Sequence, residues 1–152
     1  MAASAWRLYN EAKKYLLTAD LDLNATTVKV KLCAGTKSAA VSNFTRSTFA
    51  SLTHITTNLK TAIKSLPSIL VTAGASAKEI KFDSTAFIFS ASGGTVTSIQ
   101  YAVIGISGGK ALAWCKLSTA VFSVTTGNTL TITPHASGIF TLTGGEIGRA
   151  HV

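Results

Sequence analysis

The longest hydrophobic stretch of the chain lies in its second half. From Ile99 to Ile106 the sequence is almost continuously apolar and rich in β-branched residues, and Ser107-Gly108-Gly109-Lys110 closes it. The run has no helical period and is much shorter than the roughly 18 residues that a membrane-spanning helix needs. We therefore expect a central strand that is buried on both faces.

Shorter apolar segments before and after this strand predict a sheet with many strands. Residues 27–32 alternate, which places Val28, Val30 and Leu32 toward a core and Lys29 and Lys31 toward solvent. The Gly93-Gly94 pair is typical of a compact hairpin turn. Because strands recur at short intervals between glycine-containing turns, the fold is expected to be mainly β, an antiparallel, jelly-roll-like β-sandwich. Further strands are predicted at residues 69–72, 78–83, 85–90, 111–117, 122–124, 129–133 and 139–143.

The N-terminal segment has a different period. Its apolar residues recur at helical spacing, which predicts a helix over residues 4–18 with Ser4 as N-cap. The aromatic stripe Trp6, Tyr9 and Tyr15 would either cover the open end of the sandwich or grip a neighbouring subunit. Because a sandwich can close without this helix, we predict an attachment element rather than a part of the core.

These patterns divide the chain into three parts. Residues 1–18 form the helix, residues 19–143 the β-sandwich, and residues 144–152 a C-terminal tail expected to be mobile. Residues 35–68 show no clean period, and within them residues 58–66 fit either one or two helical turns or a strand. Long segments of this kind are usually functional or ordered by a partner.

Composition limits the possible partners. The chain has 152 residues and a formal net charge of +8, from 14 Lys and Arg against 6 Asp and Glu. The basic residues occur in ones and twos without aromatic alternation, so solvated lysines fit better than a nucleic-acid groove. An acidic protein surface remains a possible partner. No membrane segment and no secretion signal are expected.

The search for catalytic or metal-binding chemistry gives no candidate. Cys33 and Cys115 are expected to be buried thiols, with a disulfide between them as the alternative if their strands are neighbours. The Asp20–Asn24 segment fits a turn better than a cation site, and His135 fits an exposed turn histidine. We therefore expect no catalytic, cofactor-binding or metal-binding residues and no enzyme activity.

The order of several short segments resembles a known family. Leu8-Tyr9-Asn10 is followed by Leu21-Asp22-Leu23 and by the alternating strand at 28–32. Later come Ser98–Ile104, Gly127–Thr133 and Ala136–Leu142. This arrangement is similar to small structural proteins encoded among the virion genes of tailed bacteriophages, and the match covers residues 8–32 and 80–143.

The resemblance implies a non-enzymatic capsid decoration, or cement, protein. Its partner would be the major capsid protein, and the chain would be a homo-oligomer such as a trimer, made in the host bacterial cytoplasm and located on the capsid surface. The expected interface residues are Trp6, Tyr9, Tyr15, Lys29 and Lys31. A tail or receptor-binding component is the alternative, and a basic nucleic-acid-binding module is the third class.

Overall fold

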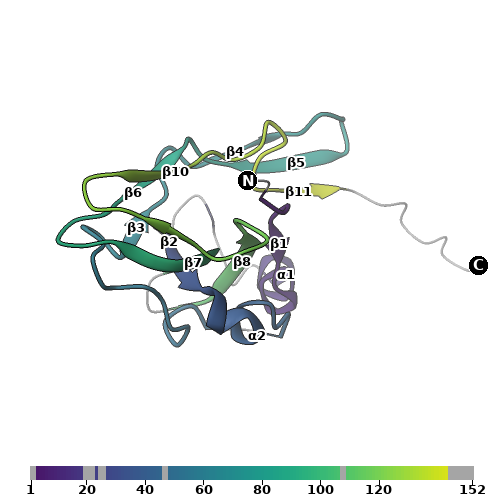
Figure 1. Ribbon diagram of the computed structural model, residues 1–152. Helices are drawn as coiled ribbons and strands as arrows, with labels where there is room; N and C mark the ends of the chain where they lie inside the picture. Colours follow the sequence, from purple (N-terminus) through teal and green to yellow (C-terminus); the bar gives the residue numbers. More distant parts are fainter. Residues whose placement is uncertain (1–2, 19–22, 24–26, 46–47, 107–108, 144–152) are drawn as a thin grey trace, which may run out of the picture.

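The computed structural model describes residues 3–18, 23, 27–45, 48–106 and 109–143, and its strands form an antiparallel β-sandwich (Figure 1). The helical elements are α1 (Asn10–Leu17), the 3₁₀ turn η1 (Gly35–Lys37) and α2 (Ser38–Val41). The strands are β1 (Arg7–Leu8), β2 (Val28–Ala34), β3 (Ile63–Ser65), β4 (Leu70–Ala73), β5 (Glu79–Asp83), β6 (Phe87–Ser90), β7 (Val96–Ile106), β8 (Ala111–Lys116), β9 (Phe122–Val124), β10 (Thr129–Ile132) and β11 (Phe140–Thr143).

The large sheet is built around β7, as the apolar run predicts. Its strand order is β1-β8-β7-β2-β3, and β9 also pairs with β7. β7 pairs with β2 on one side and with β8 and then β9 on the other, so its backbone is hydrogen-bonded along both edges. Every residue from Ile99 to Gly105 is buried. The prediction of a central strand buried on both faces is confirmed.

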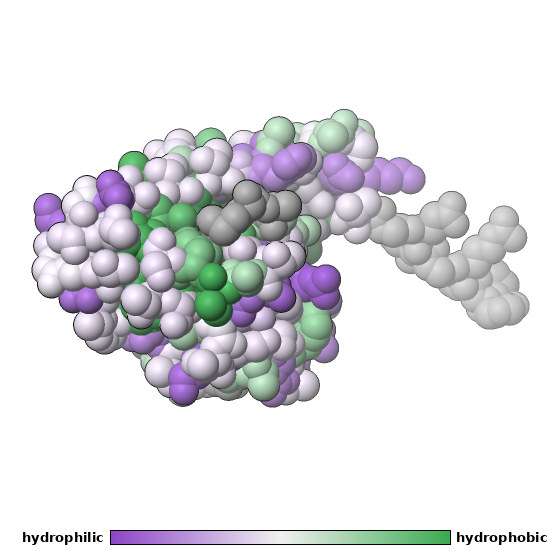
Figure 2. Space-filling view, in the orientation of Figure 1, coloured by the Kyte–Doolittle hydropathy of each residue, from purple (hydrophilic) through white to green (hydrophobic). Residues whose placement is uncertain are grey.

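The second layer consists of the β6–β10 ribbon and the β4–β5–β11 sheet. The β5–β6 segment pairs with the β10–β11 segment in both small sheets: β6 pairs with β10, and β5 pairs with β11. Phe87 and Phe89 of this layer belong to one buried cluster with Val28, Val30 and Leu32 of β2. Figure 2 shows hydrophobic side chains gathered between the β6–β10 ribbon and the large sheet. The β-sandwich is confirmed, and the jelly-roll connectivity stays a prediction.

The other face of the large sheet is covered by the helices and by the segment that follows them. The Tyr9 hydroxyl donates to the Val41 carbonyl (2.7 Å), and the Tyr101 hydroxyl is 2.7 Å from Ser38 Oγ. The rings of Phe44 and Trp114 have centroids 6.0 Å apart. The large sheet is therefore the middle layer of the molecule, which explains why β7 is apolar toward both faces.

The N-terminal prediction needs correction. The helix begins at Asn10, and Arg7 and Leu8 instead form β1, which pairs with Trp114 and Ala113 of β8. Ser4 is not an N-cap, because the N-cap position of α1 is Tyr9 and the Ser4 hydroxyl accepts from the Lys116 N–H of β8 (2.9 Å). Hydrogen bonding to the open edge of β8 overrides the local helical pattern. The segment is also part of the core, since the side chains of Tyr9 and Ala12 are fully buried.

The structure also shows the conformation of the Gly93-Gly94 pair and of the described part of residues 35–68. Gly93 has φ +80° but does not close a hairpin, because β6 pairs with β10 and the glycines carry the chain from one layer to the other. Within residues 35–68, η1 and α2 are followed by the buried side chains of Phe49 and Leu52 and by strand β3. Of the two alternatives for residues 58–66, the strand is confirmed, and it covers residues 63–65. The Asp20–Asn24 turn, apart from Leu23, and the tail at 144–152 lie outside the described residues.

Candidate functional site: a basic edge and an apolar hollow

Basic side chains collect at the edge of the large sheet where β1 and α1 meet β8. α1 packs against β8, and the Tyr9 N–H donates to the Leu112 carbonyl (3.0 Å). Residues 7–17 and 110–116 contain five cations and one acid, Glu11, and so carry half of the net charge of the whole chain. We call this surface the basic edge, and its cations are Arg7, Lys13, Lys14, Lys110 and Lys116.

Aromatic rings fix two of these cations. The Arg7 guanidinium lies 5.6 Å from the centroid of the Trp114 ring, and Lys110 Nζ lies 4.1 Å from that of Tyr15. Such contacts hold a cation in place through the negative face of the ring. Lys13 and Lys14 are instead exposed on α1. There Lys13 Nζ donates to Asn10 Oδ1 (3.4 Å) and Lys14 Nζ lies 3.9 Å from the Glu11 carboxylate. The basic edge therefore combines cations held by aromatic rings with exposed cations that make only local contacts on α1.

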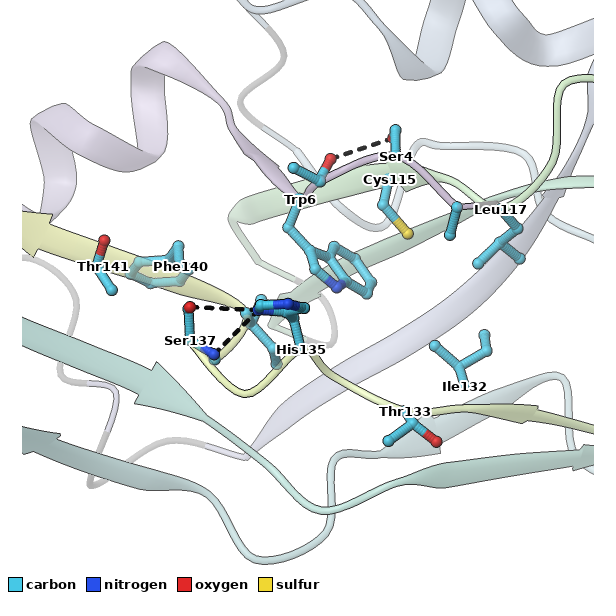
Figure 3. Close-up of a pocket in the computed structure, with 14 residues that line it drawn as sticks. Ser4, Trp6, Cys115, Leu117, Ile132, Thr133, His135, Ser137, Phe140 and Thr141 are labelled. Carbon is cyan, nitrogen blue, oxygen red and sulfur yellow. Dashed lines mark hydrogen bonds between the residues drawn. The ribbon is translucent and has the colours of Figure 1, made fainter. Parts of the chain in front are cut away.

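An apolar hollow of about 540 Å³ lies between the N-terminal segment and the chain that joins β10 to β11 (Figure 3). In Figure 3 the Trp6 indole extends toward His135, and Leu117 and Ile132 lie on the other side. Its volume is within the range of small-molecule sites. It is lined by Ala3, Ser4, Ala5, Trp6, Cys115, Leu117, Ile132, Thr133, His135, Ser137, Gly138, Ile139, Phe140 and Thr141.

The polar groups of the hollow serve local structure. His135 Nδ1 accepts from the Ser137 N–H (3.1 Å) and lies 3.2 Å from Ser137 Oγ, within a turn closed by the Gly138 N–H to the His135 carbonyl (2.7 Å). His135 is exposed and lies in a turn, as predicted. Burial raises the pKa of the Cys115 thiol to about 12, so this sulfur is not a thiolate at neutral pH.

The buried location of both cysteines is confirmed, whereas the disulfide alternative is wrong. Cys33 pairs with Tyr101 and Cys115 pairs with Ala102, so β7 lies between their strands. Tyr101 and Ala102 are consecutive in β7 and point to opposite faces of the sheet. The two sulfur atoms are therefore on opposite sides of the large sheet.

The structure does not bring the five predicted interface residues together on one surface. Trp6 is half-buried in the hollow, and Tyr15 is half-buried beneath Lys110. Tyr9 is a core residue rather than a surface anchor. Lys29 is half-buried and donates to Ser65 Oγ (2.8 Å).

The prediction that Lys31 faces solvent is wrong. Its side chain is 1% exposed, although the alternation of β2 predicts a solvated lysine. Nζ donates to the carbonyls of Phe49 and Leu52 (2.8 Å to Leu52) and lies 4.2 Å from the centroid of the Phe49 ring. Alternation identifies the face of β2 correctly, but it cannot show that the 49–52 segment folds over that face.

The charge of Lys31 also affects a neighbouring histidine. The pKa of His54 is lowered, first by burial and then by repulsion from the Lys31 ammonium, while a backbone hydrogen bond near Leu52 opposes both effects. Burial and a nearby like charge each disfavour the imidazolium. His54 is therefore neutral at neutral pH.

Sequence reasoning missed the basic edge. The basic residues were expected to be solvated and scattered in ones and twos, not gathered on one surface. The signal that could have found the edge is the excess of cations over acids in residues 7–17 and 110–116. These two segments are far apart in the sequence, and only the pairing of β1 with β8 shows that they lie side by side.

The described residues contain neither a metal-binding group nor a membrane-spanning helix. Among them, no three His, Cys, Asp or Glu side chains gather into a metal-binding group. In the same ranges, no helix is long and apolar enough to cross a bilayer.

The fold and the candidate site define a class, an antiparallel β-sandwich with a helix-covered face and a basic edge. Comparison with protein-family models, with curated proteins and with solved structures finds no match to this chain.

Proposed function

We propose that this chain is a non-enzymatic structural protein of a tailed-bacteriophage virion, of the capsid decoration type, that binds the major capsid protein through its basic edge. The observation that carries the proposal is the concentration of half of the net charge at one edge of the large sheet. The resemblance of residues 8–32 and 80–143 to small virion proteins supports the phage assignment.

The basic edge suits docking onto an acidic protein surface. Long-range attraction raises the rate of encounter, and it is screened over roughly 8 Å at physiological salt. Arg7 and Lys110 are held by aromatic rings, so they lose little conformational freedom on binding. A cement protein stabilises a shell because bound copies favour the assembled state by mass action.

The test is binding of the purified protein to undecorated phage heads as a function of ionic strength. Lys13→Glu in the basic edge should slow association, because it reverses one of the exposed cations, and the effect should shrink as salt rises. The matched control is Lys60→Glu, which makes the same charge change at an exposed site in the loop before β3. Equal effects of the two variants would contradict docking through the basic edge.

The same titration with bare DNA separates the alternative classes. A nucleic-acid-binding module would bind DNA with a steep salt dependence and would leave the heads unbound. A tail or receptor-binding component would bind neither heads nor DNA in this assay. Either result would overturn the decoration proposal.

A further inference from the structure

The β4–β5–β11 sheet carries an apolar face that the core covers only in part. Ala73, Ile80 and Leu142 are paired across the three strands, as are Val71, Phe82 and Phe140 one step further along. Paired residues share a face of a sheet, so these six side chains form one apolar surface. At the top of Figure 1 the sheet extends beyond the large sheet.

Burial changes from one row of this surface to the next. Phe82 is 2% exposed, and its ring stacks on Phe140 with centroids 4.9 Å apart, which anchors the sheet to the core. In the outer row Ile80 is 49% exposed and Leu142 is 44% exposed. Ile80 and Leu142 are cross-strand neighbours, so they form an exposed apolar patch of the kind that marks an interaction site.

The edge of this sheet is unprotected. Among the described strands, β4 has only β5 as a neighbour, and its four residues, Leu70–Ala73, are all exposed and include neither a charge nor a proline. Sheet edges are normally protected by such residues. The edges of the large sheet follow this rule, because β3 contains Lys64, whose Nζ donates to the Ile88 carbonyl, and β1 contains Arg7.

The charge of this surface does not oppose contact with a second copy. A chain with net charge +8 repels copies of itself over most of its surface. The described segment 69–83 instead contains two lysines and two acids, and Lys81 pairs with Asp83 at 3.2 Å. A second copy therefore meets little net repulsion at this surface, where apolar side chains and an open edge are available.

We propose that two copies of this chain associate through β4, which pairs antiparallel with β4 of the second copy about a twofold axis. With Val71 opposite the second copy's Val71, the two apolar faces lie on the same side of a continuous six-stranded sheet. This inference goes beyond the capsid proposal and does not depend on it. It also replaces the trimer expected from the family resemblance with a twofold contact.

The test is sedimentation equilibrium of the full chain over a range of protein and salt concentrations. We expect a reversible monomer–dimer equilibrium that strengthens as salt rises, because screening removes repulsion between two basic copies. Docking of the basic edge to an acidic partner has the opposite salt dependence, so the two proposals can fail independently.

A matched pair of variants locates the contact. Val71→Lys places a charge in β4 and should raise the dimer dissociation constant at least about tenfold. Val121→Lys makes the same change at a valine that is 54% exposed in the β8–β9 loop and should leave the constant unchanged. A wild-type chain that stays monomeric, or a dimer that responds equally to both variants, would overturn the proposal.

Amide hydrogen exchange of the wild-type protein gives a test that needs no variant. In β4 the amides of Leu70 and Thr72 face β5, in phase with the Gly74 N–H that donates to the Glu79 carbonyl, and those of Val71 and Ala73 face outward. The Val71 and Ala73 amides should therefore exchange more slowly at high protein concentration than at low concentration, because pairing with a second β4 protects them. Exchange in β4 that is independent of protein concentration would contradict this contact even if another dimer formed.

Discussion

Lys31 shows how one buried charge can organise a segment without regular structure. The 49–52 turn presents its carbonyls to the large sheet, and Lys31 Nζ donates to two of them. A buried carbonyl without a donor costs free energy, and this ammonium supplies a charged donor to the Leu52 carbonyl and a second donor to the Phe49 carbonyl, which also accepts from the Leu52 N–H (3.2 Å). The lysine is a structural residue, and a charge-reversal variant at this position would test folding rather than docking.

We expect Lys31→Met to lower the free energy of unfolding by about 1–3 kcal/mol, because methionine keeps the apolar packing but leaves the Phe49 and Leu52 carbonyls without this donor. Lys29→Met is the control, since Lys29 lies on the same strand and is only half-buried. It should change stability by about 0.5 kcal/mol or less. Urea unfolding measures both, and a Lys31→Met protein more stable than wild type would show that desolvation of the ammonium dominates.

The lowered pKa of His54 predicts a pH dependence of stability. A pKa below the ordinary value of 6.5 means that the unfolded chain binds more protons than the folded chain in this range. Stability should therefore fall as pH decreases through about 6.5, and the loss should level off below the folded-state pKa.

Urea unfolding at several pH values between about 7.5 and 5.5 tests this loss of stability. The range lies above the pKa values of ordinary carboxylates, so their titration does not contribute. His54→Gln should flatten the dependence. In wild-type protein, an NMR titration that places the His54 pKa at or above its ordinary value would contradict the assignment. Lys31→Met should raise the His54 pKa, because it removes the neighbouring positive charge.

At the scale of elements, the sequence predicts strands better than it predicts their neighbours. Residues 122–124 form a strand as predicted, and the other predicted strands agree with the structure to within a few residues. Period and turn residues are local signals, so they find a strand but not its partner. This is why the Gly93-Gly94 segment was read as a hairpin although β6 and β7 lie in different layers.

The N-terminal segment shows the same limit for the candidate site. Trp6, Tyr9 and Tyr15 have helical spacing, but β1 replaces the first helical turn because β8 offers an unpaired edge. Only this long-range pairing buries Tyr9 and brings Arg7 beside Trp114. No local pattern contains that information, so the basic edge was not predicted.

We expect the N-terminal segment to be required for folding. Tyr9→Ala should lower the free energy of unfolding by about 3–5 kcal/mol, because Tyr9 is fully buried. Leu17→Ala is the control on the same segment, since Leu17 is 88% exposed, and it should change stability by about 0.5 kcal/mol or less. Deleting residues 1–18 should prevent folding, as monitored by circular dichroism. A folded, cooperative truncated domain would contradict the placement of Tyr9 in the core.

At the scale of the whole molecule, two surfaces have separate proposed roles, and the sandwich core lies between them. The basic edge provides attraction to an acidic partner, the β4–β5–β11 sheet provides an apolar contact between copies, and the sandwich core holds the two apart. A protein with one docking surface and one self-association surface can bridge neighbouring subunits of a shell. This division suits the capsid decoration proposal, although that proposal rests on the basic edge alone.

The most direct test of that proposal is the number of copies of this chain in purified, DNA-filled phage particles, measured by quantitative mass spectrometry against the major capsid protein. A capsid decoration protein should be present at a copy number close to that of the major capsid protein. A few copies per particle would contradict the capsid location and favour a tail component, and absence from the particle would contradict the virion proposal itself.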